Sequence, residues 1–172
     1  MPIPGCQLSV WVDAPSGIIR VAGRAAAEGA QDFKLLVQKL LEQGVSKICL
    51  DLSSCLLMDS TFSGVLASLA GSPDSPASPR RHFVLVGANA RVLDLLDNLG
   101  VLPLVTVLTA TDAATDVDPG AVTPVPVGGH SKDTMAKCCL DAHRLLMCLK
   151  PENAAKFKTV TEVLEQQLQA AH

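Results

Sequence analysis

The stretch DLSSCLLMDSTFSGVL, residues 51–66, decides how the rest of the sequence is interpreted. It overlaps an alternating segment, residues 46–52, whose apolar residues at every second position predict a buried strand. After Met58, Asp59 and Ser60 precede an apolar run, and either one is a natural N-cap for a helix. We therefore expect the Ser60 hydroxyl to stand free and exposed at a helix start. The simplest interpretation is that it only caps orphan N–H groups, which contributes about 1 kcal/mol.

Strand and helix patterns alternate on both sides of this stretch. Residues 8–12 and 18–22 predict two antiparallel strands, and the residues from 33 to 41 recur with a helical period that ends before Gly44. Near-continuous apolar runs at 82–87 and 104–108 are typical of strands covered on both faces, and a helix over 92–99 lies between them. This order predicts an α/β fold with a small mixed, partly parallel sheet and helices packed on one face.

Two segments lack the apolar residues of a packed layer. Residues 71–81 are rich in proline and serine, and residues 109–132 are rich in Asp, Thr, Pro and Gly. We expect both to be mobile loops, the second one a flexible linker. Residues 133–172 then carry two helical stripes interrupted at Pro151, which predicts a C-terminal helical hairpin that either covers the sheet or serves a partner.

Composition excludes several function classes. The 172 residues carry a net charge of −3 with no block of either sign, and only 3% are aromatic, which disfavours nucleic acid as a partner. No apolar run reaches the roughly 20 residues of a membrane span. The start of the chain lacks the basic and apolar regions of a secretory signal, so we expect a cytoplasmic protein without disulfides.

The C-terminal cysteines raise the alternative of a thiol or metal enzyme. Cys139 and His143 lie one helical turn apart, with Cys138 and Cys148 nearby. Paired C-x-x-C knuckles are absent, however, and Cys138 falls on the apolar stripe, where cysteine behaves as a small hydrophobe. We expect no metal, no cofactor and no catalytic residue.

The stretch described first resembles a known family. Asp51-Leu52-Ser53, followed by residues 58–66, is similar to the signature of STAS domains, the bacterial anti-sigma factor antagonists. The order of the predicted elements is similar as well, over roughly residues 8–108. We therefore divide the chain into a STAS-like domain (1–108), a linker (109–132) and the hairpin (133–172).

The resemblance implies a non-enzymatic switch between proteins. In this family the antagonist binds an anti-sigma factor that is also a serine kinase, which frees a sigma factor for transcription, and a serine phosphatase reverses the phosphorylation. By motif position, Ser60 would accept the phosphate, with Thr61 as the second choice. Met58, Asp59 and Phe62 would join these two at the partner surface, although a glycine is usual where Phe62 stands.

Several alternatives stay open at this stage. Arg24, at the end of a predicted strand, would meet a phosphate or an acidic partner, although a solvated charge is the commoner use of such a residue. A domain of similar fold could act instead as a scaffold or as the regulatory subunit of a transport system, with Ser60 unphosphorylated. A homodimer and an exchange of the hairpin between subunits also stay open.

Overall fold

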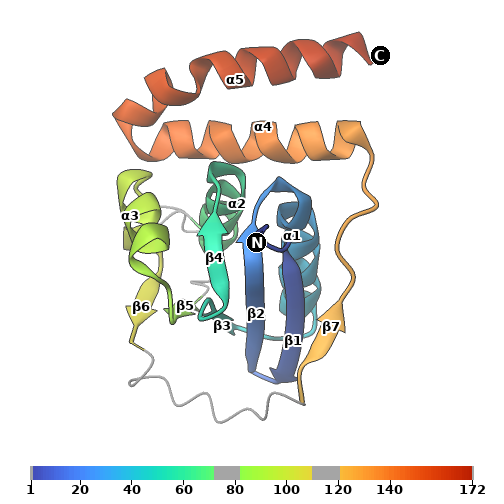
Figure 1. The fold of residues 1–172 in the computed structure, drawn as a ribbon, viewed down its shortest axis with the longest axis vertical. Helices are drawn as coiled ribbons and strands as arrows, with labels where there is room; N and C mark the ends of the chain where they lie inside the picture. The colour runs from blue at the N-terminus through green and yellow to red at the C-terminus, as the bar shows by residue number, and fades with distance from the viewer. Residues whose placement is uncertain (1, 72–81, 110–120, 172) are drawn as a thin grey trace.

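A computed structural model describes residues 2–71, 82–109 and 121–171 (Figure 1). In this part of the chain the strands are β1 (Gln7–Asp13), β2 (Ser16–Ala25), β3 (Lys47–Asp51), β4 (Cys55–Met58), β5 (His82–Val86), β6 (Thr106–Leu108) and β7 (Thr123–Val125). The helices are α1 (Ala27–Glu42), α2 (Ser60–Ala70), α3 (Ala90–Asn98), α4 (Lys132–Leu149) and α5 (Pro151–Ala170), with a 3-10 turn, η1, at Leu102–Leu104.

The strands form one mixed sheet in the order β6-β5-β3-β2-β1-β7, and β4 pairs with the end of β2. The hairpin of β1 and β2 is antiparallel. The strands β2, β3, β5 and β6 run parallel to one another. Each parallel step is made through a helix, as right-handed crossovers require. The predicted α/β fold with a partly parallel sheet is confirmed.

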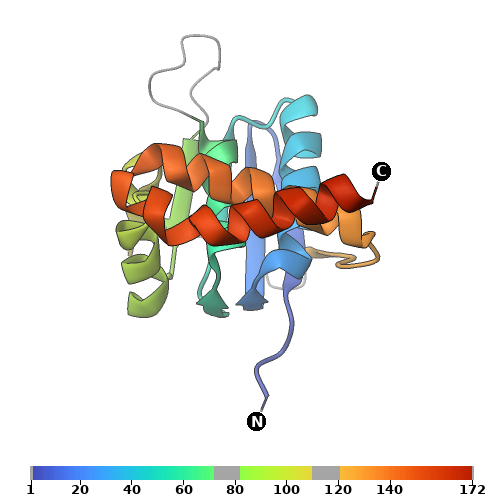
Figure 2. The same cartoon turned by 90° about the horizontal axis from the view of Figure 1, so that it is seen from above.

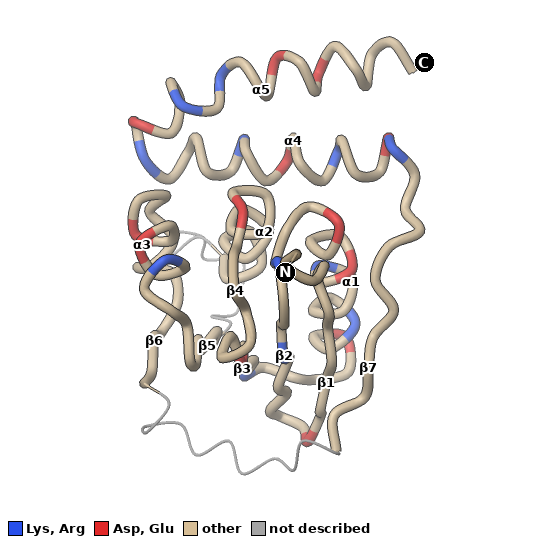
Figure 3. The backbone as a smooth tube through the Cα atoms, viewed as in Figure 1, with Lys and Arg blue, Asp and Glu red and all other residues tan. Residues whose placement is uncertain are grey.

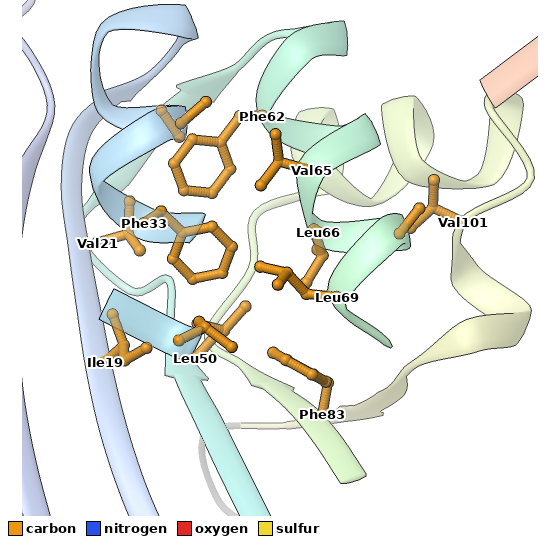
Figure 4. Packing of buried hydrophobic residues seen from close by; sticks show 14 of the residues in the cluster. Ile19, Val21, Phe33, Leu50, Phe62, Val65, Leu66, Leu69, Phe83 and Val101 are labelled. Carbon is orange, nitrogen blue, oxygen red and sulfur yellow. The ribbon is translucent and has the colours of Figure 1, made fainter. Parts of the chain in front are cut away.

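The core lies between the sheet and the helices α1 and α2, which Figure 1 places behind the strands. Side chains at alternate strand positions point to this face and are fully or almost fully buried, among them Ile19, Val21, Leu50 and Phe83 (Figure 4). Helix α2 carries no charged residue (Figure 3) and is buried along most of its length. It is therefore a central helix rather than a surface helix.

Phe62 is part of this core. Its ring stacks on that of Phe33 of α1, with centroids 4.8 Å apart, and none of its surface is exposed (Figure 4). The expectation that Phe62 lies at a partner surface is wrong, because the helix turns this position toward α1 and the sheet. An aromatic residue here fastens α2 to α1.

Three other expectations need correction or fall outside the described residues. The strand expected at 104–108 is shorter, because Leu104 belongs to the 3-10 turn η1 that contains Pro103. Only Thr106–Leu108 form β6, and this strand is largely exposed. The expected linker contains β7, which pairs with β1 and forms one edge of the sheet. Residues 72–81, which make up nearly all of the expected loop, and residues 110–120 of the linker lie outside the described residues.

The two C-terminal helices form the predicted hairpin, and it packs on the domain. Helix α4 runs across the end of the molecule where α2 begins, and α5 lies along its outer side (Figures 1 and 2). Leu146 and Phe157 of the hairpin join the hydrophobic core. At the turn between the helices, the buried Asn153 side chain donates to the carbonyl oxygens of Leu99 (2.9 Å) and Leu146 (2.8 Å). The hairpin covers the helix end of the domain, not a face of the sheet.

Phe62→Ala tests the central place of this ring. The substitution removes a fully buried aromatic side chain, so the free energy of unfolding should fall by about 3–5 kcal/mol. Leu56→Ala on β4 is the control, since Leu56 is 49% exposed, and it should cost less than about 1 kcal/mol. Urea unfolding followed by circular dichroism measures both, and equal losses would contradict the packing described.

Candidate functional site

The first part of the sequence signature, at residues 51–53, builds a turn. The Asp51 carboxylate accepts hydrogen bonds from the Arg20 side chain (2.9 Å) and from the backbone N–H of Ser53 (3.1 Å), and the Ser53 hydroxyl bonds to it as well. Burial raises the pKa of Asp51, but these hydrogen bonds outweigh it and hold the pKa below its ordinary value. Asp51 and Ser53 therefore fix the end of β3 in place.

Asp59 holds the start of two helices. One carboxylate oxygen accepts the N–H of Phe62 (2.8 Å) in the first turn of α2, and the other accepts the N–H of Ala27 (3.0 Å) at the start of α1. Each helix N-terminus leaves N–H groups without partners and carries partial positive charge, which a carboxylate satisfies. The prediction of an N-cap is confirmed for Asp59. Through these two bonds Asp59 fixes the position of Ser60.

Ser60 is the first residue of α2, and its hydroxyl is not free. Its Oγ lies 2.9 Å from Nε2 of His143, which extends from α4. The residue is only partly exposed because α4 passes over this helix start. The expectation of a free-standing hydroxyl is therefore wrong: the hairpin supplies a partner that the domain alone does not have.

His143 is nearly buried, at 6% exposure, and its ring stacks on Phe157 of α5 with centroids 4.8 Å apart. Burial lowers the pKa of His143, and the negative charge of Asp59 only partly opposes this effect. The ring is therefore neutral at neutral pH. Its second nitrogen, Nδ1, is buried and finds no hydrogen-bond partner within residues 2–71, 82–109 and 121–171. The pair of Ser60 and His143 thus lacks the third group that orients a catalytic histidine.

The contact between α2 and α4 continues along the next turn of α2. The Thr61 hydroxyl donates to the sulfur of Cys139 at 3.5 Å. A Cβ on Gly64 would lie 2.6 Å from the carbonyl oxygen of Ala142, closer than atoms tolerate, so only glycine allows α4 to approach this far. The two helices meet at a pair of small residues flanked by hydrogen bonds.

The other predicted partner residues differ in their surroundings. Met58 is partly buried against the core, and Arg24 is exposed near the end of β2. Thr61 is only 5% exposed, since α4 covers it. Sequence reasoning missed the contacts of His143 and Gly64. His143 lies at helical spacing from Cys139, which was noticed only as a metal-ligand pattern.

The C-terminal cysteines differ in their surroundings: Cys138 packs in the core, Cys139 is partly buried and Cys148 is exposed. Burial raises the pKa of Cys138 to about 11, so its thiol stays protonated at neutral pH and is a poor nucleophile. Among the residues that the structure describes, no group of three or more His, Cys, Asp or Glu side chains is arranged to hold a metal ion. The geometry gives no support to a thiol or metal enzyme.

The sheet is mixed, the signature turn follows β3, and Asp59 caps the starts of both α1 and α2. Together these features define an α/β domain of the STAS type. The family model described as "Mlab, STAS domain" matches residues 12–109, which is more than half of the chain. The chain therefore belongs to the STAS domain family. The hairpin of α4 and α5 lies outside the matched residues. No curated protein sequence gives a significant match.

Comparison with solved structures finds similar chains. The unphosphorylated anti-sigma factor antagonist SpoIIAA is similar with a TM-score of 0.50 and 17% identity, over 63% of this chain and 91% of that chain. The protein TM1081, solved by NMR, gives 0.51 and 25% over 62% and 84%. The phosphorylated SpoIIAA of Bacillus gives 0.48 and 18% over 66% and 100%. The likeness to unphosphorylated SpoIIAA shows the fold alone.

Within residues 2–71, 82–109 and 121–171, no helix combines the length and the apolar character that crossing a bilayer requires.

Asp59→Ala tests the double cap. The substitution leaves the N–H groups of Phe62 and Ala27 without their acceptor, and each lost cap costs about 1 kcal/mol, so the free energy of unfolding should fall by about 2 kcal/mol. Asp94→Ala on the exposed side of α3 is the matched control and should change stability by less than about 0.5 kcal/mol. A loss no larger than that of the control would contradict the double role of Asp59.

The lowered pKa of His143 predicts how stability depends on pH. The folded protein binds this proton more weakly than the unfolded chain, whose histidine has the ordinary pKa of 6.5. The stabilising contribution is therefore complete above about pH 6.5 and is lost as the pH falls through the lower, folded pKa. Thermal unfolding between pH 7.5 and pH 5 should show a steeper loss of Tm for the wild type than for His143→Phe, which keeps a ring against Phe157. Identical slopes would count against a buried, neutral His143.

Proposed function

We propose that this STAS protein is an anti-sigma factor antagonist whose binding to an anti-sigma factor serine kinase is switched by phosphorylation of Ser60. One observation carries the proposal. The Ser60 hydroxyl stands at the N-terminus of α2, directly after the capping Asp59 and within the signature of the family. Thr61 is the second choice, and its burial at 5% exposure favours Ser60.

The electrostatics of this position suit a reversible charge. A phosphoryl group adds about −1.5 to −2 charges, and the positive end of the α2 dipole accepts negative charge without a change of fold. The new charge would lie beside the carboxylate of Asp59. A partner that packs closely on this end must desolvate or repel it, and each 1.4 kcal/mol lost weakens binding about tenfold.

The remaining parts of the proposal follow from this role. The protein is a non-enzymatic cytoplasmic component that controls transcription, and the phosphate is removed by a serine phosphatase. Arg24 and Met58 lie at the ends of β2 and β4, which pair with each other next to the start of α2. These two residues extend the contact surface around Ser60.

A second candidate is a STAS scaffold, or the regulatory subunit of a transport system, that works without phosphorylation. One observation favours it: the Ser60 hydroxyl is already bonded to His143. In that case the serine serves only to dock the hairpin, and the hydroxyl never accepts a phosphate.

Phosphate transfer separates the two candidates. The full chain is incubated with ATP and each anti-sigma-type serine kinase encoded in its genome, and the modified residue is located by mass spectrometry. The proposal predicts phosphate on Ser60 that Ser60→Ala abolishes and that Thr61→Val leaves in place. Phosphate on neither residue with any kinase would favour the scaffold and contradict the proposed function.

A further inference from the structure

The surface that the proposed function assigns to a partner is occupied by the chain itself. Helix α4 lies over the start of α2 through the three contacts described above, which involve Ser60, Thr61 and Gly64. A kinase must reach the Ser60 Oγ with the γ-phosphate of ATP in line. His143 of α4 is hydrogen-bonded to that hydroxyl, α4 lies across the start of α2 (Figure 2), and Ser60 is only partly exposed. The docked hairpin therefore obstructs phosphate transfer.

The interface beneath α4 differs from an ordinary protein core. It brings together hydroxyl groups and a glycine of α2 with a histidine and a thiol of α4. Two buried polar atoms of the hairpin, Nδ1 of His143 and Oδ1 of Asn153, have no hydrogen-bond partner among the residues that the structure describes. Water satisfies both atoms when the hairpin leaves, so docking of the hairpin is opposed at these two points.

The hairpin is an addition to the STAS domain. It lies outside the residues that match the STAS family model, and β7, which pairs with β1, anchors the chain shortly before α4. Its apolar residues Leu146 and Phe157 nevertheless pack into the core cluster. Whatever replaces α4 must therefore cover apolar surface of α2, and it must present a small residue opposite Gly64.

We propose that the hairpin of α4 and α5 is a built-in cover of the Ser60 end, and that the anti-sigma factor kinase binds by placing a helix of its own where α4 now lies. This inference rests on the proposed function. Hairpin and kinase are then alternative occupants of one surface. Because the two bind exclusively, the fraction of open molecules sets the apparent affinity for the kinase.

Phosphorylation acts on the same equilibrium. A phosphate on Ser60 replaces the hydroxyl group that is hydrogen-bonded to the His143 ring, and it adds bulk and charge under α4. This bulk and charge would oppose the return of α4 to its place over α2. The phosphorylated protein would then hold its hairpin open.

Two variants move the cover in opposite directions. Gly64→Ala places a methyl group against the backbone of Ala142 and should open the hairpin, and alanine stabilises α2 itself. Ser68→Ala, on the exposed side of the same helix, is its control.

Thr61→Cys places a thiol beside Cys139, whose sulfur is 3.5 Å from the present hydroxyl. Oxidation should lock the hairpin shut, and dithiothreitol should release it.

Hydrogen exchange of residues 60–64 and 132–149 reports the cover without any kinase. Exchange in both segments should rise in Gly64→Ala, fall in oxidised Thr61→Cys, and match the wild type in Ser68→Ala. Far-UV circular dichroism checks that each variant is folded. If Gly64→Ala is not folded, the comparison of oxidised with reduced Thr61→Cys tests the proposal alone. Exchange that neither variant changes would overturn the cover.

The second readout is binding and phosphorylation by the kinase identified through labelling of Ser60. Because the rate follows the open fraction, it should rise about threefold or more in Gly64→Ala and fall about tenfold or more in oxidised Thr61→Cys, with recovery on reduction. Equal rates for the locked and the reduced protein would overturn the cover and leave the proposed function intact. Exchange that responds as expected, with no phosphate on Ser60 in any variant, would overturn the proposed function and its kinase while the cover stands.

Discussion

The carboxylate of Asp59 is the constraint on which the rest of the structure depends. It accepts N–H groups from the first turns of α1 and α2, and the N–H of Asp59 in turn donates to the carbonyl oxygen of Ala25 at the end of β2. One residue thus ties together a strand and two helices at the same end of the domain. With that end fixed, the rings of Phe33 and Phe62 stack on each other in the core between the helices and the sheet.

This constraint separates two roles within a single sequence signature. Asp51 bonds to Arg20 and to Ser53, and Asp59 bonds to the starts of two helices, so these residues give the site its shape. Ser60 is next in sequence, yet its hydroxyl points away from the domain, toward α4. In a STAS domain without a hairpin this hydroxyl would meet water. In this chain the hydroxyl is bonded to His143 instead, so the C-terminal helices become part of the end of the domain where α2 begins.

The predicted fold followed from local signals, whereas the errors arose where distant segments meet. Residues 46–52 and the period of residues 33–41 identified a strand and a helix correctly, because alternation and helical spacing are properties of the segment alone. The burial of Phe62 depends on which way α2 turns against α1. The contact of His143 with Ser60 joins residues 83 positions apart, and an apolar stripe indicates that α4 is buried but not against which surface. Gly64 lies within a helix, where its small size has meaning only once α4 is beside it.

The position of the hairpin over Ser60 is the central claim, and NMR of the His143 ring in the full chain tests it most directly. A long-range ¹⁵N–¹H spectrum at pH 7 should show a neutral imidazole, and nuclear Overhauser effects should connect its ring protons with the β protons of Ser60. On titration the ring should gain its proton only below pH 6.5. A His143 ring that titrates like that of a free histidine and shows no contact with Ser60 would contradict the account.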